Sequence, residues 1–97
     1  MKFLSSLLVA LALPAMAVAQ VPSDTITVFM VGDSTMADKP LDKENQERGW
    51  GQMLPIYLEG AIKVDNHAVN GRSSKSFIDE GRWDKVREQI RPGDYVI

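Results

Sequence analysis

Apolar and polar positions along this chain of 97 residues follow two periodicities in turn. Residues 25–31 (TITVFMV) form an apolar run broken only by threonine, which is typical of a strand covered on both faces. Residues 61–66 (AIKVDN) predict a short second strand with Ile62 and Val64 on one face, and residues 94–97 (DYVI) predict a third. The segments between these strands have a different, helical spacing.

The first intervening segment, residues 49–58, carries an apolar stripe at i, i+3, i+4, i+7 and i+8, formed by Trp50, Met53, Leu54, Tyr57 and Leu58. It predicts a helix that packs Trp50 and Tyr57 against the sheet, because aromatic residues on an apolar stripe usually belong to the core. Stacking of these two side chains on a sugar is the minority interpretation. Pro55 either kinks this helix or lies in its first turn. Gly60 is expected just beyond the end of the helix.

The second intervening segment predicts a helix from Trp83, Val86 and Ile90, ending at Arg91 before a Pro-Gly stop. A serine is expected to cap the helix that follows the second strand, with three candidates in Ser73, Ser74 and Ser76. Strands and helices that alternate in this way predict an α/β fold, with a parallel sheet and right-handed crossovers.

The third predicted strand lies at residues 94–97, and no polar tail, linker or cap follows it. We therefore expect residues 20–97 to be the incomplete, N-terminal part of a larger domain. In such a piece, the third strand would be incompletely covered and prone to aggregation.

The first nineteen residues have the pattern of a secretory signal peptide. Lys2 precedes an apolar run over residues 3–13, and small residues then follow Pro14 at Ala15, Ala17 and Ala19. Cleavage is expected before Gln20, with cleavage after Ala17 as the alternative. The run is too short to span a hydrocarbon core of roughly 30 Å, which disfavours a membrane anchor. The prediction is a secreted or periplasmic protein.

Composition narrows the class of protein further. The chain is 44% hydrophobic and 25% charged, which is ordinary for a globular protein, and it contains no cysteine for disulfides. Once the predicted signal peptide with Lys2 is removed, the chain has ten basic and thirteen acidic side chains, a net charge of −3. This balance gives no indication of a nucleic acid or a membrane as a partner.

Candidate chemistry lies where the first two predicted strands end. Gly32-Asp33-Ser34 follows the first strand and Gly71 follows the second, so both loops reach the carboxyl edge of the sheet. We interpret Ser34 as a catalytic nucleophile, with the backbone N–H groups of Ser34 and Gly71 as donors to an oxyanion. Asp33 is expected to order the turn by accepting backbone hydrogen bonds.

The tripeptide Gly32-Asp33-Ser34, taken alone, is also compatible with other roles for this loop. Gly-Asp-Ser also occurs in turns where both side chains only bond the backbone. A loop at residues 32–35 could bind an anion at a helix N-terminus, although no lysine stands in the Walker arrangement. The Gly-x-Ser-x-Gly elbow is absent, which argues against the α/β-hydrolase fold.

Four blocks occur in a fixed order along the chain: GDSTMA (32–37), RGWG (48–51), NGRSSKSF (70–77) and GDYV (93–96). In this order they resemble the GDSL/SGNH hydrolases, and within them the rhamnogalacturonan acetylesterases. The resemblance implies a flavodoxin-like three-layer α/β/α sandwich with a parallel sheet, truncated here after its third strand. It also implies removal of acetyl groups from an acetylated pectic polysaccharide, with no metal or cofactor.

The same resemblance assigns roles to residues of this chain. Ser34 corresponds to the nucleophile and first oxyanion donor, and Gly71 to the second donor. The third donor of the family, an Asn in a Gly-x-Asn-Asp-like block, and the catalytic His with an Asp three residues before it match no position here. A protein limited to these 97 residues is therefore expected to have little or no esterase turnover.

Four further features have two interpretations each. His67, the single histidine, could act as the base, but the resemblance places the base elsewhere and favours a hydrogen-bonded loop histidine. Arg72 and Lys75 could bind uronate groups of the substrate or pair with a carboxylate such as Asp79. Residues 37–48 could touch substrate, although a solvated surface is favoured.

Three classes of function follow. The first is an acetylesterase acting on rhamnogalacturonan. The second is another SGNH carbohydrate or lipid esterase, which acetate release from pectin fragments, compared with cleavage of short-chain lipid esters, would separate from the first. The third is a carbohydrate-binding relative without catalytic activity, which would bind oligosaccharide and fail to react with an organophosphate serine probe.

Overall fold

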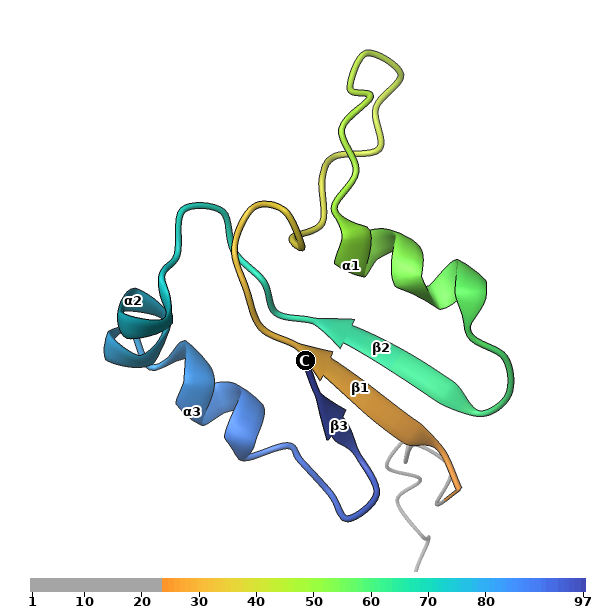
Figure 1. Cartoon of the computed structure of the whole chain (residues 1–97), viewed down its shortest axis with the longest axis vertical. Helices are drawn as coiled ribbons and strands as arrows, with labels where there is room; N and C mark the ends of the chain where they lie inside the picture. Colours follow the sequence, from red (N-terminus) through yellow and green to blue (C-terminus); the bar gives the residue numbers. More distant parts are fainter. Residues whose placement is uncertain (1–23) are drawn as a thin grey trace, which may run out of the picture.

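The computed structural model describes residues 24–97, so the predicted signal peptide lies outside the described residues. Three parallel strands form one sheet in the order β2-β1-β3, with β1 at the centre (Figure 1). The strands are β1 (Ile26–Met30), β2 (Ile62–Asn66) and β3 (Tyr95–Val96). This arrangement confirms the α/β fold with a parallel sheet that the sequence predicted.

Two crossovers carry the helices of the structure. The connection from β1 to β2 contains α1 (Trp50–Met53) and the 3-10 helix η1 (Leu54–Tyr57). The connection from β2 to β3 contains α2 (Ser74–Asp79) and α3 (Arg82–Arg87). The first crossover leads from β1 to β2, and the second leads back past β1 to β3. Because they run in opposite directions across the sheet, right-handed connections place them on opposite faces. Figure 1 shows α1 on one side of the strands and α2 with α3 on the other.

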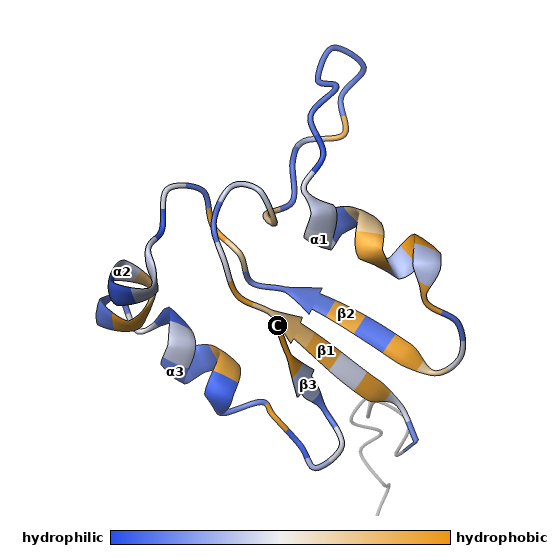
Figure 2. Cartoon of the chain, in the orientation of Figure 1, coloured by the Kyte–Doolittle hydropathy of each residue, from blue (hydrophilic) through white to orange (hydrophobic). Residues whose placement is uncertain are grey.

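The core follows from the alternation of side chains along β1. Val28 and Met30 point to one face, where they pack with Met36 and with three partly buried residues, Leu54, Val64 and Ala68. Phe29 is buried on the opposite face, as are Phe77 of α2 and Val86 of α3 in the second crossover. Figure 2 shows the corresponding hydrophobic colouring along β1, and the alternation of hydrophobic and polar residues along β2.

The first helical segment differs from the prediction in its form and in its buried face. The α-helix ends at Met53 and continues as a 3-10 helix in which Pro55 occupies the first turn. Trp50 is 44% exposed and Tyr57 is 78% exposed, so the predicted packing of both aromatic residues against the sheet is wrong within the described structure. The buried residue of α1 is Gly51, where a Cβ atom would lie 2.7 Å from the carbonyl oxygen of Met36. Of the predicted stripe, Leu54 packs against the core cluster.

The second helical segment is divided into two helices where one was predicted. Ser73 caps α2 by accepting a hydrogen bond from the N–H of Ser76 at 3.1 Å, so the first of the three candidate serines is the cap. Gly81 then takes a left-handed conformation with φ of 74°, which ends α2 before α3 begins. The predicted end at Arg91 is also wrong, because α3 stops at Arg87 and leaves Ile90 beyond it.

The third strand is held mainly by backbone hydrogen bonds and by the carboxylate of Asp94, which accepts the N–H of Thr27 at 2.9 Å. The N–H of Ile97 donates to the carbonyl of Phe29 at 2.9 Å, and the N–H of Val31 donates to the carbonyl of Ile97 at 2.8 Å. Large apolar side chains in this segment are exposed, namely Tyr95 (62%), Val96 (41%) and Ile97 (51%). The expected incomplete cover of the third strand is therefore confirmed for the described residues. Within them, no helix is long and apolar enough to cross a bilayer.

Candidate active site

Ser34 lies in a tight turn directly after β1, and Asp33 organises that turn. The Oδ1 atom of Asp33 accepts hydrogen bonds from the N–H of Thr35 at 3.1 Å and from its hydroxyl at 3.0 Å. These two bonds hold the pKa of the Asp33 carboxyl below its usual value, so it stays ionised. The carbonyl of Asp33 also accepts the N–H groups of Met36 and Ala37. The predicted role of Asp33 in ordering the turn is confirmed, and Ser34 is exposed at its tip.

The first residues of α1 donate backbone hydrogen bonds to this turn. The N–H of Trp50 donates to the carbonyl of Thr35 at 2.9 Å, and the N–H of Gly51 donates to that of Met36 at 3.2 Å. A Cβ atom on Gly49 would lie 1.9 Å from the carbonyl oxygen of Ala37, so only glycine permits this approach of two backbones. The RGWG block is therefore a contact surface for the serine turn.

The loops of Ser34 and Gly71 leave the sheet side by side. Beyond the ends of β1 and β2 the ladder continues, because the N–H of His67 donates to the carbonyl of Met30 at 2.8 Å and that of Val69 to Gly32 at 3.0 Å. Ser34 and Gly71 each follow the last bonded pair, Gly32 and Val69, by two residues. The structure therefore brings the two predicted site residues to equivalent positions at one edge of the sheet.

Two polar side chains connect these loops. The amide nitrogen of Asn66 donates to the carbonyl of Met36 at 2.9 Å and to Oδ1 of Asp38 at 2.8 Å, which joins the end of β2 to the serine turn. The ammonium of Lys39 donates to the carbonyl of Ser34 and to Oδ1 of Asn70, the latter at 3.1 Å. One ammonium thus binds both loops of the predicted site.

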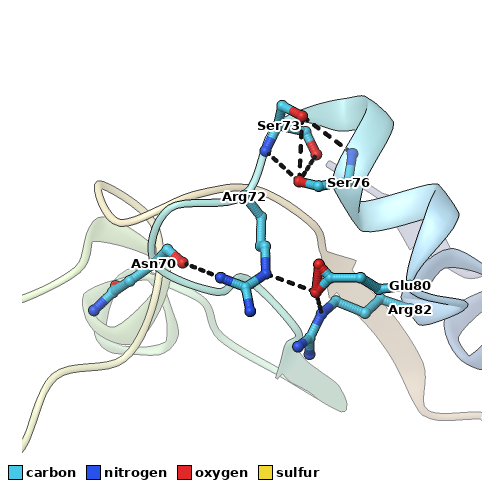
Figure 3. A network of polar contacts seen from close by, with 6 residues as sticks. All are labelled: Asn70, Arg72, Ser73, Ser76, Glu80 and Arg82. Atoms are coloured by element: carbon cyan, nitrogen blue, oxygen red, sulfur yellow. Dashed lines mark hydrogen bonds and ion pairs between the residues drawn. The ribbon is translucent and has the colours of Figure 1, made fainter.

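Gly71 has φ of 72°, a left-handed conformation that glycine adopts without strain, and a Cβ atom there would meet nothing within 4 Å. The neighbouring Arg72 points back over the loop, as Figure 3 shows. Its Nη1 donates to the carbonyl of Asn70 at 3.0 Å and its Nε donates to Oε1 of Glu80 at 2.7 Å. The guanidinium groups of Arg72 and Arg82 beside Glu80 lower the pKa of its carboxyl.

A cavity of about 470 Å³ lies beside the serine turn, on the side of α2 and α3. Its walls include Asp33 and Thr35 from the turn, Arg72 from the glycine loop, and the apolar side chains of Phe77 and Trp83. Ser34 itself does not line this cavity. The strand ends and the hydrogen bonds between the loops therefore locate the candidate site better than the cavity does.

The structure places the other candidate residues as follows. Lys75 donates to Oδ2 of Asp79 at i, i+4 on the exposed face of α2, which is the pairing that its second interpretation described. Nε2 of His67 lies 3.0 Å from Oδ2 of Asp65, without the geometry of a hydrogen bond. Among residues 24–97, no hydrogen bond or ion pair joins His67 to Ser34.

Sequence reasoning did not single out Lys39, Asn66 or Gln52 as parts of the site. Gln52 accepts the N–H of Lys39 at 3.1 Å and donates to its carbonyl at 2.9 Å, which anchors the loop segment on α1. Lys39 and Asn66 had detectable signals: a lysine five residues after the candidate serine, and an asparagine at the end of a strand. These contacts join residues 13 to 31 positions apart, so no local pattern predicts them.

No protein-family model matches the chain, whereas individual proteins do. Rhamnogalacturonan acetylesterase RhgT of Bacillus subtilis is 42% identical over 72 residues, covering 74% of this chain and 31% of the relative. The rhamnogalacturonan acetylesterase of Emericella nidulans is 32% identical over 71 residues, covering 73% of this chain and 25% of the relative. The chain thus spans about a third or less of the length of these relatives.

A solved structure agrees with the sequence matches. The crystal structure of protein YxiM from Bacillus subtilis superposes with a TM-score of 0.68 at 33% identity, covering 74% of this chain and 21% of that one. The chain therefore shares its α/β fold and its parallel β2-β1-β3 sheet with this part of these proteins. The chain is similar to rhamnogalacturonan acetylesterases from a bacterium and a fungus, which agrees with the resemblance of its sequence blocks to the GDSL/SGNH hydrolases.

Proposed function

We propose that the whole protein is a secreted serine esterase that removes acetyl groups from rhamnogalacturonan. The observation that carries this proposal is the hydrogen bond from the Val69 N–H to the Gly32 carbonyl at 3.0 Å. That bond aligns the loops of Ser34 and Gly71, because Gly32 and Val69 lie two residues before these positions. The proposed nucleophile and the second backbone donor therefore lie at the same end of the sheet.

The proposed reaction proceeds through an acetyl-enzyme. Oγ of Ser34 attacks the acetyl carbonyl carbon while a base takes the hydroxyl proton, and the carbonyl oxygen becomes an oxyanion. The N–H groups of Ser34 and Gly71 stabilise this charge. The bond to the sugar oxygen then breaks, and that oxygen leaves with the proton from the base. Water, activated by the same base, hydrolyses the acetyl-Ser34 ester to acetate.

The base and a third oxyanion donor are proposed to come from the remainder of the protein, because the chain spans only 31% of RhgT. The one histidine present, His67, lies beside Asp65 in the extension of the β2 ladder. No contact links it to Ser34 among the described residues. The resemblance likewise assigns the base to a histidine that this chain does not contain.

Two observations support an acidic polysaccharide as the substrate. Relatives from a bacterium and a fungus are both named rhamnogalacturonan acetylesterases. Arg72 and Lys75 flank the glycine loop, and Nη2 of Arg72 has no hydrogen-bond partner among residues 24–97. We propose that these cations contact uronate groups of the polymer. Export through the predicted signal peptide would bring the enzyme to this extracellular substrate.

The test is acetate release from acetylated rhamnogalacturonan by the whole protein and by its Ser34→Ala variant. We expect turnover by the parent and a loss of at least about 10³-fold in the variant, with an unchanged thermal melting curve. Greater activity on short-chain lipid esters than on pectin fragments would replace the substrate part of the proposal. Binding of oligosaccharide without any hydrolysis by the parent would contradict catalysis altogether.

A further inference from the structure

The peptide group between Asn70 and Gly71 carries the second proposed oxyanion donor and is the central peptide of a turn, which is closed by the hydrogen bond from the Arg72 N–H to the Val69 carbonyl at 3.3 Å. Both residues lie in a turn between β2 and α2, and both are exposed. No atom lies within 4 Å of the position that a Cβ of Gly71 would take. The closing bond of a turn fixes its ends but leaves two orientations open to its central peptide. An oxyanion donor must be aimed before the charge develops, so a further contact has to hold this peptide in place.

Arg72 provides that contact through the carbonyl of the same peptide. Its Nη1 donates to the carbonyl oxygen of Asn70 at 3.0 Å (Figure 3). The carbonyl and the N–H of a trans peptide point in opposite directions within one plane, and every peptide bond of the described residues is trans. A guanidinium that holds the Asn70 carbonyl on one side therefore directs the Gly71 N–H to the other.

The guanidinium is itself held in place. Oε1 of Glu80 accepts the Nε of Arg72 at 2.7 Å and the Nε of Arg82 at 3.0 Å, at the junction of α2 and α3. The carboxyl has a lowered pKa because of these two cations, so this anchor is charged across the neutral range. Arg82 shares the carboxylate but makes no hydrogen bond to Asn70.

Lys39 holds the same residue from the opposite loop. Its ammonium donates to Oδ1 of Asn70 at 3.1 Å, to the carbonyl of Ser34, and to that of Ala37 at 3.0 Å. Gln52 of α1 fixes the backbone of Lys39 from both sides. Asn70 is thus bound through its backbone by Arg72 and through its side chain by Lys39.

We propose that Arg72 and Lys39 are positioning residues that hold the Gly71 N–H in register with the Ser34 turn. Arg72 acts through the Asn70 carbonyl, and Lys39 acts through the Asn70 side chain and the Ser34 carbonyl. This role rests on the proposed function, in which the Gly71 N–H stabilises the oxyanion. It is separate from any contact of Arg72 with uronate, because it concerns the Nη1 atom and a backbone carbonyl.

The kinetic test uses the whole protein and p-nitrophenyl acetate, which has no sugar or uronate for Arg72 to bind. Loss of a whole oxyanion donor costs about 10²–10³ in kcat, so a misdirected one is expected to cost roughly 10–100-fold in Arg72→Met and in Lys39→Met. KM should change by less than about threefold, and Arg72→Lys should recover part of the loss. Arg82→Met is the matched control, expected to stay within about twofold of the parent.

The coupling between the two cations is a second kinetic criterion. Both are proposed to act on one peptide, so the double variant should lose less than the product of the two single losses. Equal kcat in Arg72→Met and Arg82→Met, or a change confined to KM, would overturn the proposal while leaving Ser34 catalysis intact.

A measurement that needs no turnover separates this inference from the proposed function. The amide ¹H–¹⁵N resonance of Gly71 should move in Arg72→Met and keep its position in Arg82→Met. If the parent is inactive, the proposed function fails, and this resonance still decides whether Arg72 orients the peptide. A Gly71 resonance that is the same in Arg72→Met as in the parent would refute the positioning role.

Discussion

The two crossovers of this sheet are fastened in different ways. The first, through α1 and η1, brings backbone against backbone, with Trp50 and Gly51 donating to carbonyls of the serine turn and Gly49 packed on Ala37. The second, through α2 and α3, relies on side chains such as Arg72, Glu80 and Asp94. Backbone contact leaves little freedom to the serine turn, whereas the contacts of charged side chains can be changed by single substitutions.

The two loops of the candidate site are therefore held in different ways. The turn that presents Ser34 is fixed by hydrogen bonds within itself and from a helix, and its position depends on the fold as a whole. The loop that presents Gly71 depends on a few cations. Substitutions at the backbone contacts of the first crossover should therefore act mainly on stability, and those of the cations that bind the glycine loop, Lys39 and Arg72, mainly on catalysis.

The largest effect should come from Gly49→Ala in the first crossover. The new Cβ would lie 1.9 Å from the carbonyl oxygen of Ala37, and neither backbone can move without displacing the serine turn. We expect the free energy of unfolding to fall by about 3 kcal/mol or more. Urea denaturation of the whole protein measures this change.

Gly60→Ala is the matched control for that experiment. Gly60 has φ of 89° with nothing within 4 Å of its Cβ position, so alanine there adds backbone strain without a clash. A cost of roughly 1–2 kcal/mol is expected. A loss at Gly49 no larger than at Gly60 would show that the close backbone contact is unimportant.

Next in size are truncations of Met30 and Val86, the largest fully buried side chains among residues 24–97. Met30 belongs to the core cluster beneath the first crossover, and Val86 lies in α3 of the second. Met30→Ala should cost about 2–5 kcal/mol and Val86→Ala roughly 1.5–3 kcal/mol, measured by denaturant unfolding. The reverse order would mean that the second crossover is the better packed of the two.

A smaller, pH-dependent effect is expected at Asp94, which fastens β3. Its side chain is 2% exposed and accepts the N–H groups of Thr27 at 2.9 Å and Arg91 at 2.8 Å, which lower the pKa of its carboxyl. A depressed pKa in the folded state contributes stability above the unfolded value of about 3.9, and that contribution is lost as the pH falls through the folded pKa.

The Asp94→Asn variant tests that linkage. Its deficit in the urea midpoint relative to the parent should be constant above about pH 5 and should shrink as the pH falls below about 3.9. A deficit that stays constant down to acid unfolding would show that the ionised carboxylate is not what fastens the strand.

The smallest effect on stability is expected at Lys75. Its pair with Asp79 is exposed on α2, with 83% and 57% of the two side chains accessible, so Lys75→Ala should cost at most about 0.5 kcal/mol. The informative readout is KM on acetylated rhamnogalacturonan compared with p-nitrophenyl acetate. A KM that rises in the variant only on the polymer supports uronate binding. A KM equal to that of the parent on both substrates would leave Lys75 with no role beyond its surface ion pair with Asp79.

The features that the sequence predicted are those with a local cause. The apolar run at residues 25–31, the Gly-Asp-Ser stop and the cap at Ser73 depend on neighbours along the chain, and each is present in the structure. The buried face of α1 was mispredicted because apolar spacing gives no information about close backbone approach, which places Gly51 rather than Trp50 against the core.

The contacts that complete the candidate site depend on distant residues. Lys39 meets Asn70 only because the loops after β1 and β2 lie side by side, and Arg72 meets Glu80 from the other end of α2. A pattern in the sequence can propose Ser34 and Gly71 as strand-end residues. No local pattern predicts the contact between Lys39 and Asn70 that joins their loops.

The most direct test of the account is the site of modification by an organophosphate serine probe. The whole protein would be treated with the probe, digested and examined by mass spectrometry, with Ser34→Ala treated in parallel. The account predicts one phosphonylated peptide, carrying the modification at Ser34, and no labelling of the variant. Labelling at another serine, or none in a protein that hydrolyses acetate esters, would contradict the assignment of Ser34 as the nucleophile.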